Sequence, residues 1–115
     1  MTQTDAELIR QVLRDRRGQT AYRALVERYS RAVYNLAYRM LGNPSDAEDV
    51  AQETFLKAFQ RLDTFQIDRR FPPWLLRVTH NTAVDLLRRA RPDSRDIDEV
   101  DIASTDRSGP AAALE

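Results

Sequence analysis

Arginine side chains are concentrated between residues 69 and 91, in a pattern that suits contact with a nucleic acid. Guanidinium groups neutralise phosphates, so a row of them on one surface can follow a phosphate backbone. Asn81 lies among them, and a side-chain amide can pair with the edge of a base. Aromatic residues lie nearby, and such rings stack on exposed bases. The arginines of this segment are Arg69, Arg70, Arg77, Arg88, Arg89 and Arg91.

A second candidate surface precedes the arginine-rich segment and is acidic and polar instead of basic. Its residues recur at positions i, i+3, i+4, i+7 and i+11, which places them on one face of a helix. They are Asp49, Gln52, Glu53, Leu56 and Gln60. Leu56 is a single apolar residue among hydrogen-bonding groups, as in the centre of a small protein interface with a polar rim. The pattern favours a protein-binding face, and the alternative is an ordinary solvated helix exterior.

Apolar residues at helical spacing predict that helices position both surfaces. The first helix is expected to begin with a capping box formed by Thr4 and Glu7 and to run to about residue 16. The second is expected over residues 20–41, because its apolar stripe keeps a 3.6-residue period. Gly42 is placed to take the left-handed conformation that ends a helix.

The acidic residues belong to a third expected helix, which begins with a second capping box at Ser45 and runs to about residue 62. Residues 63–71 show no sustained period and are predicted to form a loop. The fourth helix is expected over residues 72–90, since the two prolines at its start suit a first helical turn. No segment alternates like a strand. The predicted fold is therefore all-α, a compact bundle of about four helices.

Length and composition restrict the class of protein. A chain of 115 residues forms one small domain, and 42% hydrophobic with 31% charged residues is typical of a globular protein. No apolar run approaches the ~20 residues that span a bilayer, and no signal peptide is visible. Without cysteines the chain has neither disulfides nor thiolate metal sites, so we expect a cytoplasmic location and no cofactor. One histidine and no glycine-rich phosphate loop argue against an enzyme.

The net charge of zero divides unevenly along the chain. Residues 1–91 carry 16 basic and 11 acidic residues, whereas residues 92–115 carry 2 and 7. This asymmetry predicts a polyanion-binding helical domain over 1–91 and a flexible acidic linker over 92–115. The last five residues, Ala-Ala-Ala-Leu-Glu, are typical of a translated cloning site.

Several motifs together resemble region 2 of bacterial sigma factors of the extracytoplasmic-function (ECF) group. The resemblance covers about residues 20–91, and its motifs are specific in combination. Tyr22-x-x-Leu-x-x-x-Tyr29 and Tyr38-Arg-Met-Leu-Gly42 come first, followed by the run Asp46-Ala-Glu-Asp-Val-Ala-Gln-Glu-Thr-Phe55. Two later motifs are Phe71-x-x-Trp-Leu75 and His80-Asn-x-x-x-Asp85-x-x-Arg-Arg89. The chain departs from the family pattern at Pro72-Pro73, which stiffens the loop exit, and at Thr79-His80, which removes one phosphate partner.

The resemblance implies a helical domain of a transcription initiation factor. It implies that the acidic residues dock on the clamp helices of the RNA polymerase β′ subunit. It also implies that the loop and the fourth helix recognise the promoter minus-ten element as a melted non-template strand, with one base flipped into a loop pocket. The DNA-binding residues are then expected to be Phe65, Gln66, Arg69, Arg70, Trp74, Arg77, His80, Asn81, Arg88 and Arg89. Family members are usually held inactive by an anti-sigma protein, so we expect such a partner. We also expect the domain to be a monomer.

Two other functions fit part of the pattern. A helix-turn-helix regulator that reads duplex DNA unaided needs a short turn before its recognition helix, and a loop of about nine residues followed by two prolines argues against it. A protein-binding helical adaptor predicts that reversing the charges of Arg77, Arg88 and Arg89 leaves function intact. Within the basic surface, Asp85 is expected to orient Arg88 or Arg89, and Trp74 is expected to pack in the core.

Overall fold

A computed structural model describes residues 2–90, and the regular elements in this range are all helical. They are α1 (Asp5–Arg14), α2 (Thr20–Leu41), α3 (Pro44–Gln60), the short 3-10 helix η1 (Leu62–Thr64) and α4 (Phe71–Ala90). The all-α fold predicted from the sequence is confirmed. None of the helices within residues 2–90 is long and apolar enough to cross a membrane. The predicted linker, residues 92–115, lies outside the described residues.

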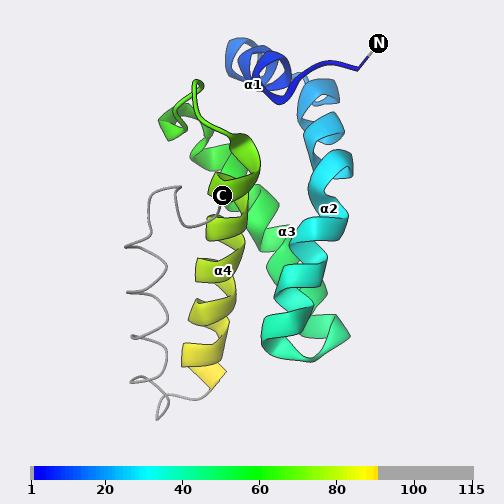
Figure 1. The fold of residues 1–115 in the computed structure, drawn as a ribbon, viewed down its shortest axis with the longest axis vertical. Helices are drawn as coiled ribbons and strands as arrows, with labels where there is room; N and C mark the ends of the chain where they lie inside the picture. Colours follow the sequence, from blue (N-terminus) through cyan, green and yellow to red (C-terminus); the bar gives the residue numbers. More distant parts are fainter. Residues whose placement is uncertain (1, 91–115) are drawn as a thin grey trace.

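The three long helices pack side by side, and α1 lies across one end of them (Figure 1). α2 contacts both α3 and α4, and α3 also contacts α4. Each long helix therefore has two long neighbours, which explains why apolar residues occupy a wide part of its circumference. The loop between α3 and α4 lies at the same end of the bundle as α1, where α1 contacts η1 (Figure 1).

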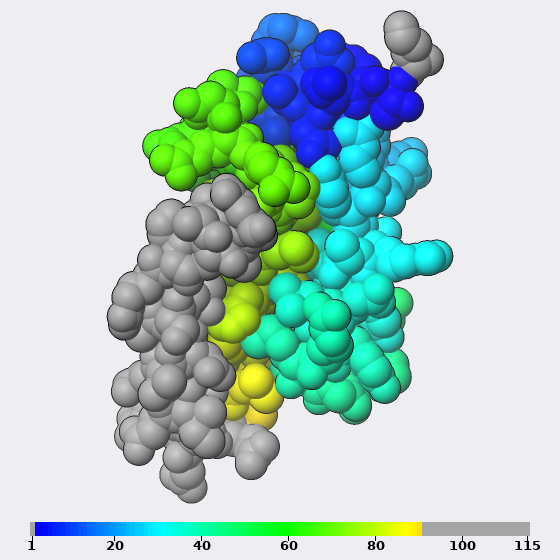
Figure 2. Space-filling view, viewed as in Figure 1, coloured from blue at the N-terminus to red at the C-terminus, as the bar shows by residue number. Residues whose placement is uncertain are grey.

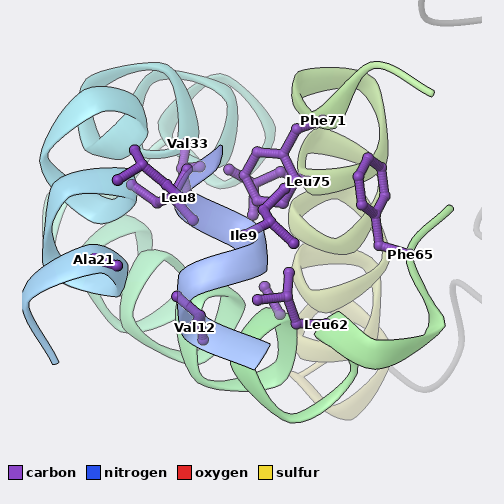
Figure 3. Close-up of a cluster of buried hydrophobic side chains, with 11 residues drawn as sticks. Leu8, Ile9, Val12, Ala21, Val33, Leu62, Phe65, Phe71 and Leu75 are labelled. Carbon is purple, nitrogen blue, oxygen red and sulfur yellow. The ribbon is translucent and has the colours of Figure 1, made fainter. Parts of the chain in front are cut away.

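The main hydrophobic core lies at the end of the bundle that carries α1 (Figure 3). Leu8, Ile9 and Val12 of α1 are buried in one cluster with Leu62 of η1 and Leu75 of α4. Fully burying one such aliphatic side chain contributes about 1.5–3 kcal/mol. A helix as short as α1 is marginal in isolation, so this packing is what keeps it folded.

The capping signals of the first two helices are confirmed. Thr4 and Glu7 form the expected capping box, and Gly42 ends α2 in the left-handed region with a φ of 70°. α1 ends slightly before the expected residue 16. The carboxylate of Asp15 accepts hydrogen bonds from the backbone amides two and three residues later, which favours a turn over another helical residue.

The expected cap of the third helix at Ser45 is wrong, because the helix begins two residues earlier and a different side chain caps it. The Oδ1 atom of Asn43 accepts a hydrogen bond of 2.9 Å from the amide of Asp46, and Pro44 occupies the first helical position. A proline is favoured there because its missing amide hydrogen has no helical partner. Asparagine is as effective a cap as serine.

Candidate nucleic-acid and protein interfaces

The segment between α3 and α4 is built on three aromatic rings. Phe65, Phe71 and Trp74 contact one another in pairs, with ring centroids between 5.3 and 5.7 Å apart. Phe65 and Phe71 meet edge to face at 89°, an arrangement that the ring quadrupoles favour. Both phenylalanines also belong to the main core. The predicted loop therefore has a fixed aromatic base.

A cavity of about 190 Å³ opens beside these rings, and we call it the loop pocket. Six of the ten residues predicted to bind DNA line it, together with Thr64. These six are Phe65, Gln66, Arg69, Arg70, Trp74 and Arg77. The lining combines guanidinium groups with aromatic rings, so it offers partners to a base and to the phosphates beside it.

The two aromatic residues of the loop pocket differ in exposure. Phe65 is 9% exposed and packs against the other two rings, so it forms a wall more than an open stacking surface. Trp74 is half-buried, because its ring packs against the main core and also lines the pocket. The expectation that Trp74 packs in the core is confirmed. The same ring is reachable from the loop pocket.

The other predicted DNA-binding residues lie farther along α4 and outside the loop pocket. They are His80, Asn81, Arg88 and Arg89. Val84, which helical spacing places between Asn81 and Arg88, is buried with 2% exposure. It is covered because α4 packs against both α2 and α3. The basic residues of α4 therefore do not form one continuous exposed row.

The expectation that Asp85 orients an arginine of its own helix is wrong. Its carboxylate lies 3.8 Å from the Nζ atom of Lys57 on α3. The same Nζ atom lies 3.2 Å from the carboxylate of Glu53, and it donates a hydrogen bond of 3.4 Å to the hydroxyl of Thr82 on α4. Lys57 thus connects α3 to α4. Each exposed ion pair of this kind contributes at most about 1 kcal/mol.

The predicted face of α3 is exposed, and we call its five residues the acidic face. Asp49, Gln52 and Gln60 are exposed, whereas Glu53 is half-buried. Leu56 is 58% exposed, more than any other large hydrophobic side chain of residues 2–90. The five side chains therefore lie on one accessible side of the helix, as their spacing predicted.

A hollow of about 500 Å³ beside Leu56 was not predicted from the sequence. It lies between α2 and α3, and its apolar lining includes Tyr22, Val26, Phe55 and Phe59. The hydroxyl of Tyr22 donates a hydrogen bond to the carbonyl of Phe55, and burial raises the pKa of this hydroxyl above its ordinary value. The apolar stripe of α2 was the feature of the sequence that could have indicated this hollow. Its position beside the acidic face depends on how α2 and α3 pack.

Comparison with known proteins identifies the family. The family described as Sigma-70 region 2 matches residues 25–92, which include α3, α4 and the loop pocket. The chain belongs to the sigma-70 region 2 family. This membership confirms the resemblance seen in the sequence motifs.

Curated relatives of this sigma region 2 chain include sigma factors of the ECF group. The ECF RNA polymerase sigma factor SigW of Bacillus subtilis is 44% identical over 75 residues, which cover 65% of this chain and 40% of the relative. The ECF RNA polymerase sigma-E factor of Escherichia coli K12 is 36% identical over 108 residues, which cover 92% of this chain and 55% of the relative. The chain spans about half the length of these relatives.

A solved structure shares the fold as well as the sequence. It is the NMR structure of the complex formed by an engineered region 2 of sigmaE with GTAAAA. The match has a TM-score of 0.70 and 38% identity, and it covers 79% of this chain and 99% of the solved chain. The predicted sigma region 2 fold is confirmed.

Proposed function

We propose that this domain acts in transcription initiation by joining RNA polymerase core to promoter DNA. The observation that carries the proposal is the loop pocket, because it gathers six of the ten predicted DNA-binding residues on one surface. Family membership and the ECF sigma factors among the relatives support the same function. So does the similar region 2 that was solved in complex with GTAAAA.

The loop pocket is proposed to enclose one flipped base of the non-template strand of the minus-ten element. A base inside a duplex is stacked and paired, so it must leave the helix before a pocket can surround it. The half-buried ring of Trp74 offers a stacking surface, and the amide of Gln66 offers hydrogen bonds to a base edge. Stacking contributes about 1–3 kcal/mol per base, which offsets part of the cost of unstacking.

Arginine residues are proposed to hold the phosphates of the same strand. Arg69 and Arg70 are exposed at the loop pocket, and Arg77 lines it from α4. His80, Asn81, Arg88 and Arg89 are proposed to contact the DNA farther along α4. Because each neutralised phosphate releases a counterion, binding should weaken steeply as the salt concentration rises.

The acidic face is proposed to bind the clamp helices of the polymerase β′ subunit. Leu56 and the hollow beside it offer apolar area, and the surrounding carboxylates and amides offer a polar rim. Asp49 makes no ion pair within residues 2–90, so its charge is available to a basic residue of the partner. The charge of Glu53 is shared with Lys57.

An anti-sigma protein is proposed as a further partner of the domain. The ECF sigma factors among the relatives support a partner of this kind. A protein that covered either the acidic face or the loop pocket would block one of the two contacts that initiation requires. We propose that the domain acts as a monomer in the cytoplasm, where RNA polymerase is found.

A pool of single-stranded DNA with randomised sequence tests the proposed function. The affinity of the domain for the enriched strand is then measured with the strand alone and with the corresponding duplex, both at one salt concentration. We expect the single strand to bind about fivefold more tightly, since stacking of one base contributes about 1 kcal/mol or more. Arg69→Ala should weaken this binding. Arg31→Ala is the matched control, because Arg31 is exposed on α2 and lines a hollow toward α3.

The outcomes separate the candidate functions. Tighter binding to the duplex would support a helix-turn-helix regulator. That alternative also needs a short turn between its helices, whereas the connection between α3 and α4 runs from residue 61 to residue 70. Undiminished binding by Arg69→Ala would remove the loop pocket from the DNA interface.

A further inference from the structure

A second cavity, of about 450 Å³, lies between α2 and α4, and we call it the side cavity. Figure 1 shows these two helices side by side, and Figure 2 shows their surfaces meeting on one face of the domain. α2 contributes Asn35, Leu36 and Arg39, and α4 contributes Leu76, Arg77 and His80. Four of these residues were not predicted to have any role in binding: Asn35, Leu36, Arg39 and Leu76.

The side cavity is basic, and two of its polar groups, on Arg39 and His80, lack partners in the described part of the chain. No acidic side chain of residues 2–90 lines it. Arg39 is exposed and makes no ion pair within this range. The Nδ1 atom of His80 is buried and has no hydrogen-bond partner.

The lining also contains apolar surface, which narrows the class of ligand. Leu36 and Leu76 face the same space as the arginines. A free inorganic anion would use the guanidinium groups and leave the leucines without a partner. A nucleotide uses both, because its phosphate pairs with guanidinium groups and its base packs on apolar side chains. The amide of Asn35 can pair with a base edge.

The position of Arg77 indicates which nucleotide would occupy the side cavity. Arg77 lines both the loop pocket and the side cavity, so the two spaces adjoin at one residue. A strand whose base enters the loop pocket therefore passes the side cavity within a short length of backbone. We propose that the side cavity binds a neighbouring nucleotide of the same single strand, with Arg39 holding its phosphate. This inference deepens the proposed function and rests on it.

Neutral methylphosphonate linkages test the phosphate contact. The enriched single strand is synthesised with one such linkage at a time, and the affinity of each strand is measured by fluorescence anisotropy. For the wild type, neutralising the phosphate held by Arg39 should lower the affinity about fivefold, because a charge-assisted hydrogen bond is lost. For Arg39→Ala, the unmodified strand should already bind about fivefold more weakly, and that one linkage should have no further effect.

The salt dependence gives an independent readout. Arg39→Ala should reduce the slope of log affinity against log salt by about 0.7, the value for one phosphate contact on a single strand. Arg39→Lys should restore the slope, because the charge is retained. Arg31→Ala should keep the wild-type slope and the wild-type response to every linkage. Since Arg39 is exposed, all these variants should melt at the wild-type temperature.

The results distinguish a failure of this inference from a failure of the proposed function. If Arg39→Ala binds as tightly as the wild type while Arg69→Ala is weakened, the side cavity does not hold the strand and the loop pocket still does. If Arg39→Ala is weakened but remains sensitive to every linkage, Arg39 contacts no phosphate and the inference is overturned. If the wild type binds no single strand, the proposed function fails first.

Discussion

The acidic face and the loop pocket lie on the same small domain but differ in how many elements build them. The acidic face belongs to one helix, and its residues share a side of α3 through helical geometry alone. The loop pocket draws on the end of η1, the irregular segment that follows and the first two turns of α4. One surface is a local feature of the chain, and the other is a product of tertiary packing.

This difference determines what each surface can recognise and how it responds to substitution. An exposed helix face suits another helix, which needs area and charge but no enclosure. A pocket with an aromatic wall can surround a single base. The acidic face can change without disturbing the interior, whereas Phe65 and Phe71 support the loop pocket and the main core at once.

The largest expected effect is on the loop pocket and the fold together. Trp74→Ala removes a ring that packs against Phe65, Phe71 and the main core. We expect the free energy of unfolding to fall by about 3 kcal/mol, as for other large aromatic truncations, and single-stranded DNA binding to be lost. Urea unfolding followed by circular dichroism measures the first effect. Trp74→Phe is the control, and a loss as large as that of Trp74→Ala would show that more than ring packing is involved.

The next effect concerns polymerase binding by the acidic face. Asp49→Arg should lower the affinity for an isolated β′ clamp-helix fragment about tenfold, or 1.4 kcal/mol, because it reverses an unpaired charge. Glu53→Arg should also weaken binding, but it places a like charge beside Lys57 and so disturbs the link to α4. Asp49→Arg is therefore the cleaner variant.

Titration calorimetry of the folded variants measures this affinity. Glu27→Arg is the matched control, because Glu27 is an exposed carboxylate on α2. Undiminished affinity in Asp49→Arg and Glu53→Arg would remove the acidic face from the polymerase interface. A folded wild type that does not bind the fragment would leave the DNA contact as the only proposed activity.

A smaller effect is expected from the exposed arginines of the loop pocket. Replacing Arg69 or Arg70 by glutamine should reduce the salt slope for single-stranded DNA by about 0.7 each. The affinity for the β′ fragment should stay unchanged, since no residue of the acidic face lines the loop pocket. Anisotropy titrations at four salt concentrations provide the slopes. A parallel loss of fragment affinity would show that the two surfaces are not independent.

The smallest expected effect on stability is at the centre of the acidic face. Leu56→Ala should change the free energy of unfolding by no more than about 0.5 kcal/mol, because the side chain is 58% exposed. The same variant should weaken binding to the β′ fragment, since it removes the apolar centre of the interface. Thermal unfolding and calorimetry on one preparation give both values. A large loss of stability would mean that Leu56 supports the hollow between α2 and α3.

Sequence reasoning succeeded where structure depends on near neighbours in the chain. The capping box at Thr4, the end of α2 at Gly42 and the exposed face around Leu56 all follow from spacings of a few residues. It failed where a choice between distant partners decides the geometry. Asp85 meets Lys57 of another helix, and Val84 is covered by neighbouring helices, although local spacing placed both among the basic residues of α4.

The sequence by itself determined the helices, the family and the chemical types of residue available for each interface, because periodicity, caps and motifs are properties of adjacent residues. Only the tertiary structure decided that Phe65 is a wall of the loop pocket, that a hollow adjoins Leu56, and that Arg39 of α2 lies across a cavity from His80 of α4. Helical periodicity tells which residues share a side of one helix. Which sides of two helices meet depends on how their side chains interdigitate over the whole core.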